Sequence, residues 1–539
     1  MAEGGEVRAS RGRVVMLVCN GVKGDSRVQK AARSAAEAGW DVVLLGRSPD
    51  SKQHTWRLGE AEVRLIPVPL TLGAGPYRYR RPWLRRPLAY RPGPTAAYQA
   101  QRVKARRADL HVRRCASRIE ARRAGWRGLR GRLAQLLLIP ARSAAKARAG
   151  WVGLRGRHTT RWQESRRTCD LPLDRLRVAV WRALLGRRSW RRLWPMLWDF
   201  ELGYGKVVDR LRPDLIHAND FRVLGVGARA TLRARSQGRP AKLVWDAHEF
   251  LPGIKPWALD ARWKPAHIDH EREYAPYADA VVTVSGTLAD LLRDTHRLPR
   301  TPAVVLNAPE AAPAPAQEGD PVPCIRETCG VRPDVPLLVY SGGAVPQRGL
   351  VTMVEGMPQL PDAHVALVVH DTKLAYVREL RARAAELGAS ERLHVLPYVP
   401  YWQVSRFLAS ADVGVIPIHH YPNHELALIT KFFEYSHARL PIVVSDVRTM
   451  ARTVRETGQG EVFTAEDVTA YVDAVRKVLA APARYRAAYD APGLLESWTW
   501  EAQAGVLDEV YSELLPDRPR FPQRTTSSPE PAPTLIGGN

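Results

Sequence analysis

The stretch that decides the fold is NHELALITKFFEYSHARLPIVVSD, residues Asn423–Asp446. A Lys-x-x-Glu pair, Lys431 and Glu434, stands at the start of a short apolar segment that predicts a helix. Pro441 then leads into the apolar run IVVS, which predicts a buried strand. A loop, a helix start and a strand at this spacing form one αβ unit of a doubly wound parallel sheet. The polar residues lie where such sheets bind ligands.

The same alternation of apolar strands with helix-length segments extends over most of the chain. In the first half it predicts strands at Val14–Cys19, Asp41–Gly46, Pro213–His217, Lys242–Asp246, Ala280–Ser285 and Ala303–Asn307. In the second half it predicts strands at Leu337–Tyr340, Val365–Val369, Leu393–Leu396, Val413–Ile416 and Ile442–Ser445. Strands separated by helices argue for parallel sheets. We therefore predict an α/β protein with one sheet in each half.

Two motifs of the second half resemble motifs of the family 4 glycosyltransferases. Residues 431–446 are similar to the donor-binding signature of that family, in the variant NKLFEY-x-x-x-G-x-P-V-V-x-S-D. Tyr340–Gly343 followed by Gln347–Leu350 is similar to its phosphate loop, G-G-x-x-x-x-R-G-L. The resemblance implies the GT-B fold, in which two Rossmann-like doubly wound parallel sheets face a cleft. It also implies a nucleotide-diphosphate sugar as substrate, no cofactor and no metal, and a retaining hexosyltransferase.

The candidate donor-binding residues combine glycines with opposite charges. Gly342 and Gly343 allow backbone N–H groups to approach the phosphates. Arg348 supplies a fixed positive charge that can stabilise a departing diphosphate. The resemblance assigns Glu434 to the nucleotide ribose, and Lys431 lies one helical turn before it on the same face. We predict that Arg348 and Lys431 also act in catalysis. The alternatives are a plain strand-to-helix turn and a solvent-exposed ion pair.

Two further donor-side residues follow from the resemblance. Tyr398 lies in a segment similar to the one that lines the base pocket, although a proline-bounded loop would look the same. The more common family pattern is Glu-x7-Glu, and Leu426 stands where its first glutamate is expected. Glu425 is one residue away, and we include it among the donor-binding residues. Arg439 replaces the customary glycine, which affects the expected loop geometry.

The candidate acceptor side lies in the first half. Asp246–Glu249 follows a predicted strand and is similar to the D-x-H-E motif of the family. His248 would project into the cleft as a catalytic group that can hydrogen-bond the sugar or the acceptor. Asp25 and Arg27 belong to a stretch similar to N-D-x-R-V. Arg27 can meet an anionic acceptor or pair with Asp25, and Asp25 can instead cap a helix.

The pattern also predicts domain boundaries. We expect a flexible leader at 1–12, an acceptor-side Rossmann-like domain at 13–310, a linker at 311–323, a donor-binding Rossmann-like domain at 324–490, a C-terminal crossover helix at 491–515 and a disordered tail at 516–539. A basic insert at 78–192 interrupts the first domain. It holds 33 Lys and Arg against 5 Asp and Glu, so the other residues, with 48 and 50, are close to neutral. Such a field attracts polyanions.

The insert contains a repeat in which tryptophan stands among arginines. ARRAGWRGLRGR at Ala121–Arg132 recurs as KARAGWVGLRGR at Lys146–Arg157. Basic amphipathic helices with Trp and Leu on the opposite face lie at membrane interfaces. We therefore consider an anionic membrane surface as a partner of residues 78–192, and a partly disordered tract without a partner as the alternative. Nucleic acid is not expected, because no nucleic-acid-binding motif is recognisable.

The remaining features bear on location and role. Five scattered cysteines favour a reduced compartment over a zinc site, and we find neither a signal peptide nor an apolar run long enough to span a membrane. We expect a bacterial cytoplasmic enzyme, or one peripheral on the inner face of the plasma membrane. It would use a lipid-linked, glycan or small-molecule acceptor in cell-envelope glycolipid, polysaccharide or cell wall synthesis. The alternative is a catalytically decayed GT-B scaffold that binds polyanions or membranes.

Overall fold

The computed structural model describes residues 10–50, 52–68, 70, 72, 87–90, 95–122, 124–167, 170, 172–254, 260–311 and 324–519. The chain forms two compact units. The first comprises Met1–Pro69, Phe200–Ile254 and His270–Asn539, and the second comprises Leu70–Asp199 and Lys255–Asp269. The predicted linker at 311–323 and the tail at 516–539 fall almost wholly outside the described residues.

Within the described residues, the first sheet has eight strands in the order β3-β4-β2-β1-β5-β6-β7-β8. Neighbouring strands are parallel except β3 and β4, which are antiparallel. The strands are β1 Arg13–Leu17, β2 Asp41–Arg47, β3 His54–Leu58, β4 Ala61–Ile66, β5 Leu215–Asn219, β6 Lys242–Asp246, β7 Ala280–Thr283 and β8 Ala303–Val304. The helices connected to them include α1 Ser26–Glu37, α7 Leu197–Leu211, α8 Phe221–Ser236, α9 Trp263–Tyr274 and α10 Gly286–His296.

The second sheet has six described strands, all parallel, in the order β11-β10-β9-β12-β13-β14. They are β9 Leu337–Ser341, β10 His364–Val369, β11 Leu393–Pro397, β12 Val413–Ile416, β13 Ile442–Ser445 and β14 Gly460–Phe463. The connecting helices include α12 Leu350–Gly356, α13 Ala375–Glu386, α14 Val404–Leu408, α15 Thr430–His437, α16 Arg448–Thr457 and α17 Val468–Ala480. Two largely parallel sheets with intervening helices confirm the predicted fold class.

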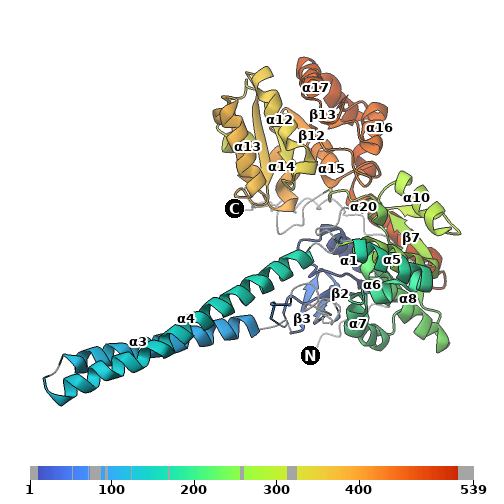
Figure 1. Cartoon of the computed structure of the whole chain (residues 1–539). Helices are drawn as coiled ribbons and strands as arrows, with labels where there is room; N and C mark the ends of the chain where they lie inside the picture. The colour runs from blue at the N-terminus through green and yellow to red at the C-terminus, as the bar shows by residue number, and fades with distance from the viewer. Residues whose placement is uncertain are drawn as a thin grey trace, which may run out of the picture. The chain divides into compact units, whose positions relative to one another are not determined.

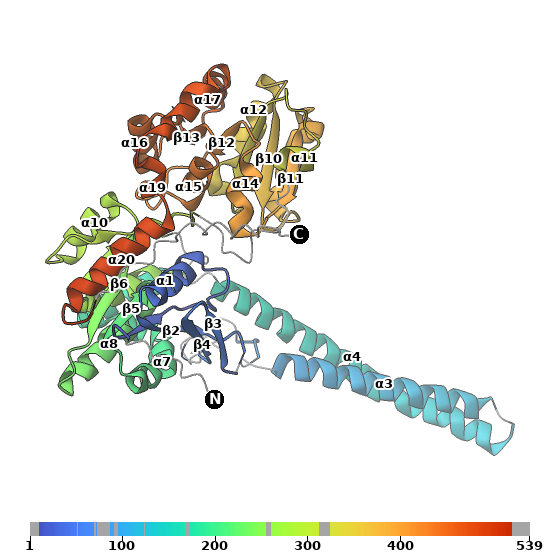
Figure 2. The same cartoon turned by 180° about the vertical axis from the view of Figure 1, so that it is seen from behind.

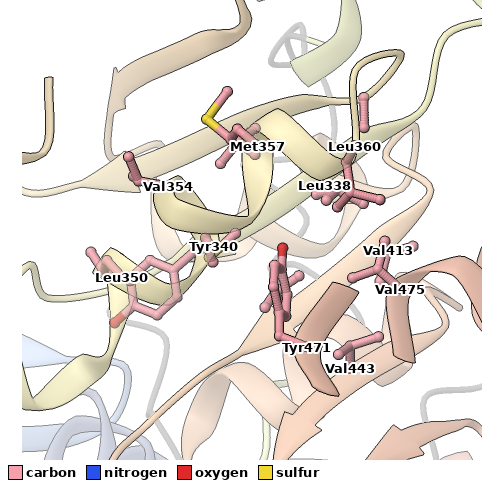
Figure 3. Close-up of a cluster of buried hydrophobic side chains, with 14 of the residues drawn as sticks. Leu338, Tyr340, Leu350, Val354, Met357, Leu360, Val413, Val443, Tyr471 and Val475 are labelled. Atoms are coloured by element: carbon pink, nitrogen blue, oxygen red, sulfur yellow. The ribbon is translucent and has the colours of Figure 1, made fainter. Parts of the chain in front are cut away.

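The second sheet carries an apolar core on each face. Strand β9 is buried throughout, and its side chains alternate between the cores: Leu338 and Tyr340 on one face, Leu337 and Val339 on the other. Figure 3 shows the first of these cores, where β9 meets side chains of α12 and α17 such as Leu350 and Tyr471. Burial on both faces explains why the strands of this sheet read as continuous apolar runs in the sequence.

The C-terminal helix packs against the first sheet. The segment predicted as one helix is two, α19 Leu494–Ser497 and α20 Trp500–Leu514, because the Thr499 side chain accepts a hydrogen bond from Ala502 N and caps the second. Helix α20 lies beside α1 (Figure 2), and residues of both helices belong to one core, in which the Tyr511 ring centroid is 5.8 Å from that of Trp40. Arg11, predicted to lie in a flexible leader, is buried and pairs with Asp508 at 2.8 Å.

The second unit contains the whole basic insert 78–192, and its described parts are mostly helical. Its two long helices, α3 Thr95–Ala121 and α4 Trp126–Arg167, lie antiparallel and side by side (Figures 1 and 2). They approach so closely that a Cβ added at Gly131 would lie 2.3 Å from the backbone nitrogen of Ala121. The helix α5, Pro172–Leu185, follows. Among the helices described, none is long and apolar enough to cross a bilayer.

Candidate functional site

The loop after β9 places backbone close to a buried cation. Gly342 has a φ of +150°, and a Cβ added there would lie 2.4 Å from Lys431 Nζ and 3.0 Å from the Tyr340 hydroxyl oxygen. Gly343 faces open space, with no atom within 4 Å of its added Cβ. The loop ends at Gly349, whose φ is +69° and whose added Cβ would lie 1.7 Å from the Pro417 carbonyl oxygen. Only glycine fits at Gly349, so this turn fixes the path of the loop.

Lys431 is buried in the first turns of α15, not part of an exposed ion pair. Its Nζ lies 3.4 Å from the Tyr340 hydroxyl and 4.7 Å from the centroid of that ring. Burial and then the charge of Arg348 lower the pKa of Lys431 to about 7, and Glu434 opposes them. The site therefore holds positive charge that its own carboxylate does not offset, as a site for an anion requires.

Arg348 is the second cation of this site. The structure gives its guanidinium neither a hydrogen bond nor an ion pair with any described residue, and its Nη1 is buried. Buried N–H groups in proteins almost always have partners. A guanidinium left without one beside a second buried cation matches a bound anion with several acceptor oxygens, such as a diphosphate.

Glu434 lies on α15, one helical turn after Lys431. Burial raises the pKa of Glu434, and the charges of Lys431 and Lys30 oppose that rise. Lys30 comes from α1 of the first sheet, where its Nζ donates to the Ala308 carbonyl and its pKa is lowered to about 7 by burial. Sequence reasoning missed Lys30. The signal was a lysine on the apolar face of a predicted helix.

The other two donor-side residues differ from each other. Tyr398 is about half exposed. Burial and then the charge of Glu434 raise the pKa of Tyr398, and the charge of Arg348 opposes them. The Tyr398 hydroxyl therefore lies near both charged groups. Glu425 makes contacts within its own half of the chain. One of its oxygens accepts from Arg448 N at 2.7 Å and the other lies 2.6 Å from His420 Nδ1. One partner lies in the loop after β12 and the other at the start of α16, so Glu425 connects these two segments, and its role in donor binding stays a prediction.

The two predicted acceptor-side residues near the N-terminus, Asp25 and Arg27, both form hydrogen bonds with other residues of the chain. Asp25 caps α1, accepting from Val28 N at 3.3 Å, as one of the predicted alternatives required. Arg27 does not pair with Asp25. It is buried and donates twice to Asp246, at 2.8 and 3.1 Å, and once to the Val305 carbonyl at 2.8 Å. Three of its five N–H groups are thus bound inside the protein, and contact of Arg27 with an anionic acceptor stays a prediction.

His248 follows the carboxyl end of β6, beside the same carboxylate. Its Nδ1 lies 3.6 Å from Asp246 Oδ1. Burial lowers the pKa of His248, but contact with the Asp246 carboxylate outweighs it and raises the pKa to about 9. Arg27 lies against the same carboxylate, whose pKa is well below its ordinary value. The raised pKa favours the imidazolium form of His248, and this form can donate a hydrogen bond.

The predicted residues thus fall into two groups. The first group lies at the ends of β9 and β11 and the start of α15, and consists of Gly342, Gly343, Arg348, Tyr398, Lys431 and Glu434. Asp25, Arg27 and His248 belong to the first sheet, where Asp246 connects Arg27 with His248. The first group can bind a diphosphate and its nucleoside, and the second offers one charged donor, His248.

Comparison with known proteins gives two family matches that cover both halves. Residues 162–308 match the family described as Glycosyltransferase Family 4, and residues 325–491 match Glycosyl transferases group 1. A D-inositol 3-phosphate glycosyltransferase of Xylanimonas cellulosilytica is 27% identical over 36% of this chain and 46% of its own length. A GDP-mannose-dependent alpha-(1-6)-phosphatidylinositol monomannoside mannosyltransferase of Mycolicibacterium smegmatis is 27% identical over 35% and 50%. The chain thus matches about half the length of these relatives.

Solved structures extend the likeness to the whole fold. Sucrose-phosphate synthase from Thermosynechococcus elongatus superposes with a TM-score of 0.57 at 15% identity, over 94% of this chain and 100% of that one. The Anabaena protein HepE, in complex with UDP and glucose, gives 0.54 at 12% identity over 93% and 100%. Both halves carry family matches and the two sheets share this architecture. The chain belongs to the group 1 glycosyltransferases of family 4 and has the GT-B fold.

Proposed function

We propose that this protein transfers a hexosyl group from a nucleoside-diphosphate sugar to a hydroxyl acceptor, with retention of the anomeric configuration. The observation that carries the proposal is the unpartnered guanidinium of Arg348 beside the buried Lys431 and the open backbone at Gly343. Two cations beside a single carboxylate leave an excess of positive charge, which fits a diphosphate leaving group. Glu434, on the same helix as Lys431, accepts hydrogen bonds from the ribose hydroxyls in this proposal.

The reaction needs few protein groups beyond these. The bond between the sugar C1 and the β-phosphate oxygen breaks as the acceptor oxygen forms its bond to C1 on the same face. The acceptor proton passes to the departing phosphate oxygen, so no protein base is required. Arg348 and Lys431 stabilise the charge that develops on the diphosphate. His248, as an imidazolium, donates a hydrogen bond to a sugar or acceptor hydroxyl.

For the acceptor we propose a lipid-linked or glycan hydroxyl of the cell envelope, reached from the cytoplasmic face of the membrane. The names of the two relatives support an inositol-containing or mannosylated acceptor as the first to be tested. Arg348, Lys431 and Glu434 are all present and lie close together, whereas a catalytically decayed scaffold would not need all three groups. Their presence therefore favours an active enzyme.

A panel of nucleotide sugars tests the proposal. UDP- and GDP-linked hexoses are added to the purified chain, and thermal stabilisation is measured, since a ligand that binds only the folded state raises its melting temperature. We expect one nucleotide class to stabilise the protein and its sugar to be transferred to a hydroxyl acceptor with unchanged anomeric configuration. Stabilisation without any transfer would favour the decayed scaffold, and no stabilisation by any member would contradict the proposal.

Donor binding is expected to take up protons above about pH 7. Lys431 has a pKa of about 7 in the free protein, because burial and Arg348 disfavour its charged form. A bound diphosphate raises that pKa, so affinity should fall as pH rises above 7, by up to about tenfold per unit. Calorimetric titrations with UDP or GDP in buffers of different ionisation enthalpy measure the uptake. Lys431→Met should abolish it. Lys30→Met is the control, because the pKa of Lys30 is also lowered to about 7. If proton uptake disappears in Lys30→Met but remains in Lys431→Met, the proton binds to Lys30.

Turnover is expected to survive chelation of divalent ions. Arg348 and Lys431 together provide the positive charge that a metal ion provides in other transferases. Initial rates with the donor identified above, measured with and without EDTA, should agree within experimental error. Loss of turnover on chelation that Mg²⁺ or Mn²⁺ restores would contradict this expectation.

A further inference from the structure

The outward face of α4 is an uninterrupted apolar stripe. At 3.6 residues per turn, nine apolar residues fall on a stripe about 100° wide. All nine are exposed: Trp126, Leu129, Leu133, Leu136, Leu137, Pro140, Ala144, Ala147 and Trp151. Leu137 alone is 78% exposed, and exposed leucines rarely line up in this way on the surface of a soluble domain.

This stripe is separate from the face that α4 uses within its own unit. Gly128 and Gly131 are buried, and their positions lie about 140° and 160° around the helix from Leu133. Gly131 contacts the backbone of α3 closely. One face of α4 therefore packs on α3, and the apolar stripe needs a different partner.

The internal repeat fixes the two ends of the stripe. Trp126 and Trp151 occupy the same position in the two copies, 25 residues apart. This spacing is almost seven helical turns, so both indoles lie on one face about 37 Å apart along the axis. Tryptophan is enriched where an apolar phase meets water. Two such anchors at this spacing suit a helix that lies flat on an extended interface.

The charge around the stripe identifies the interface. Residues 95–167 contain 20 Lys and Arg against 3 Asp and Glu, an excess of 17. Arg130 and Arg148 are exposed, and each lies about 70° from the middle of the stripe. A second copy of this chain would bring equally basic surfaces together. Nucleic acid would satisfy the arginines but leave the leucines in water. A bilayer with anionic lipid takes up both.

We propose that the stripe from Trp126 to Trp151 lies flat in the headgroup region of an anionic membrane, with its leucines and tryptophans in the acyl boundary and its flanking arginines at lipid phosphates. This surface is independent of the donor site. It fits a lipid-linked acceptor, but it does not require one.

Vesicle co-sedimentation of the full chain tests the surface. We expect binding to phosphatidylglycerol-containing vesicles, weaker but retained at high salt, and little binding to phosphatidylcholine alone. The double variant Leu133→Gln/Leu137→Gln should bind at least about tenfold more weakly at both salt concentrations. The matched control is Val112→Gln/Ile139→Gln, since both residues are more than half exposed. Val112 lies on α3, and Ile139 lies about 110° around α4 from the middle of the stripe. Circular dichroism confirms that both variants remain helical.

Equal binding by the two double variants, or no binding of the wild type to anionic vesicles, would overturn the proposal. Self-association that the stripe variant alone abolishes, without vesicle binding, would identify a second copy as the partner instead. A mobility shift of DNA or RNA that the stripe variant leaves unchanged, again without vesicle binding, would identify nucleic acid.

Discussion

The Gly349→Ala variant is expected to lose at least about 4 kcal/mol of its free energy of unfolding, or not to fold. Gly349 has a φ of +69°, and its added Cβ would lie 1.7 Å from the Pro417 carbonyl oxygen. That oxygen belongs to the backbone just after β12, a central strand of the second sheet, so it cannot move aside without disturbing the sheet. Urea unfolding followed by circular dichroism measures the loss.

The control is Gly343→Ala in the same loop. A Cβ at Gly343 meets no atom within 4 Å. Its unfolding midpoint should therefore stay close to that of the wild type, even if donor binding changes. Should Gly349→Ala unfold within about 1 kcal/mol of the wild type, the described path of the phosphate loop would be wrong.

Removing the charged groups of the donor site is expected to weaken nucleotide binding without destabilising the fold. Arg348→Ala removes charge-assisted contacts worth about 1.5–3 kcal/mol, so the Kd for UDP or GDP should rise at least about tenfold. Glu434→Gln keeps its shape but loses the ionised acceptor for the ribose, and we expect a loss of similar size. Stability should hold, because Arg348 has no partner among the described residues.

The two cations should not act independently. Arg348 lowers the pKa of Lys431, so its removal leaves Lys431 more fully charged and partly compensates the loss. The double variant Arg348→Ala/Lys431→Met should therefore bind more weakly than the sum of the two single effects predicts. Titration calorimetry measures all three, with Arg381→Ala, an exposed arginine of the same domain, as the control. Unchanged affinity in Arg348→Ala or in Glu434→Gln would refute the assignment.

The sequence predicted those parts of the fold that local patterns determine. The strands of the parallel sheets were recognisable because burial on both faces makes them continuous apolar runs. The hairpin of β3 and β4 was missed because β3 is largely exposed at the edge of its sheet and lacks such a run. The short strand β14 is only partly buried and was missed for the same reason.

Long-range pairings could not be predicted. Arg27 and Asp246 are 219 residues apart, and nothing in the sequence indicated that the arginine would donate its hydrogen bonds to that carboxylate. Glu425 was placed on the donor side because it lies one residue from the expected position of a family glutamate. Its contacts with His420 and with the backbone N–H of Arg448 could not be predicted from that position. The sequence of α4 has apolar residues on two faces of the helix. Only the packing of α3 on one of them shows that the other, the apolar stripe, is exposed.

The central claim is that a nucleoside-diphosphate sugar binds at the ends of β9 and α15. A crystal structure of the protein with UDP or GDP, whichever the panel selects, tests it most directly. We predict the diphosphate within hydrogen-bonding distance of Arg348, Lys431 and the backbone at Gly343, and the ribose hydroxyls at Glu434. A nucleotide bound elsewhere, or phosphates that contact neither Arg348 nor Lys431, would contradict the claim.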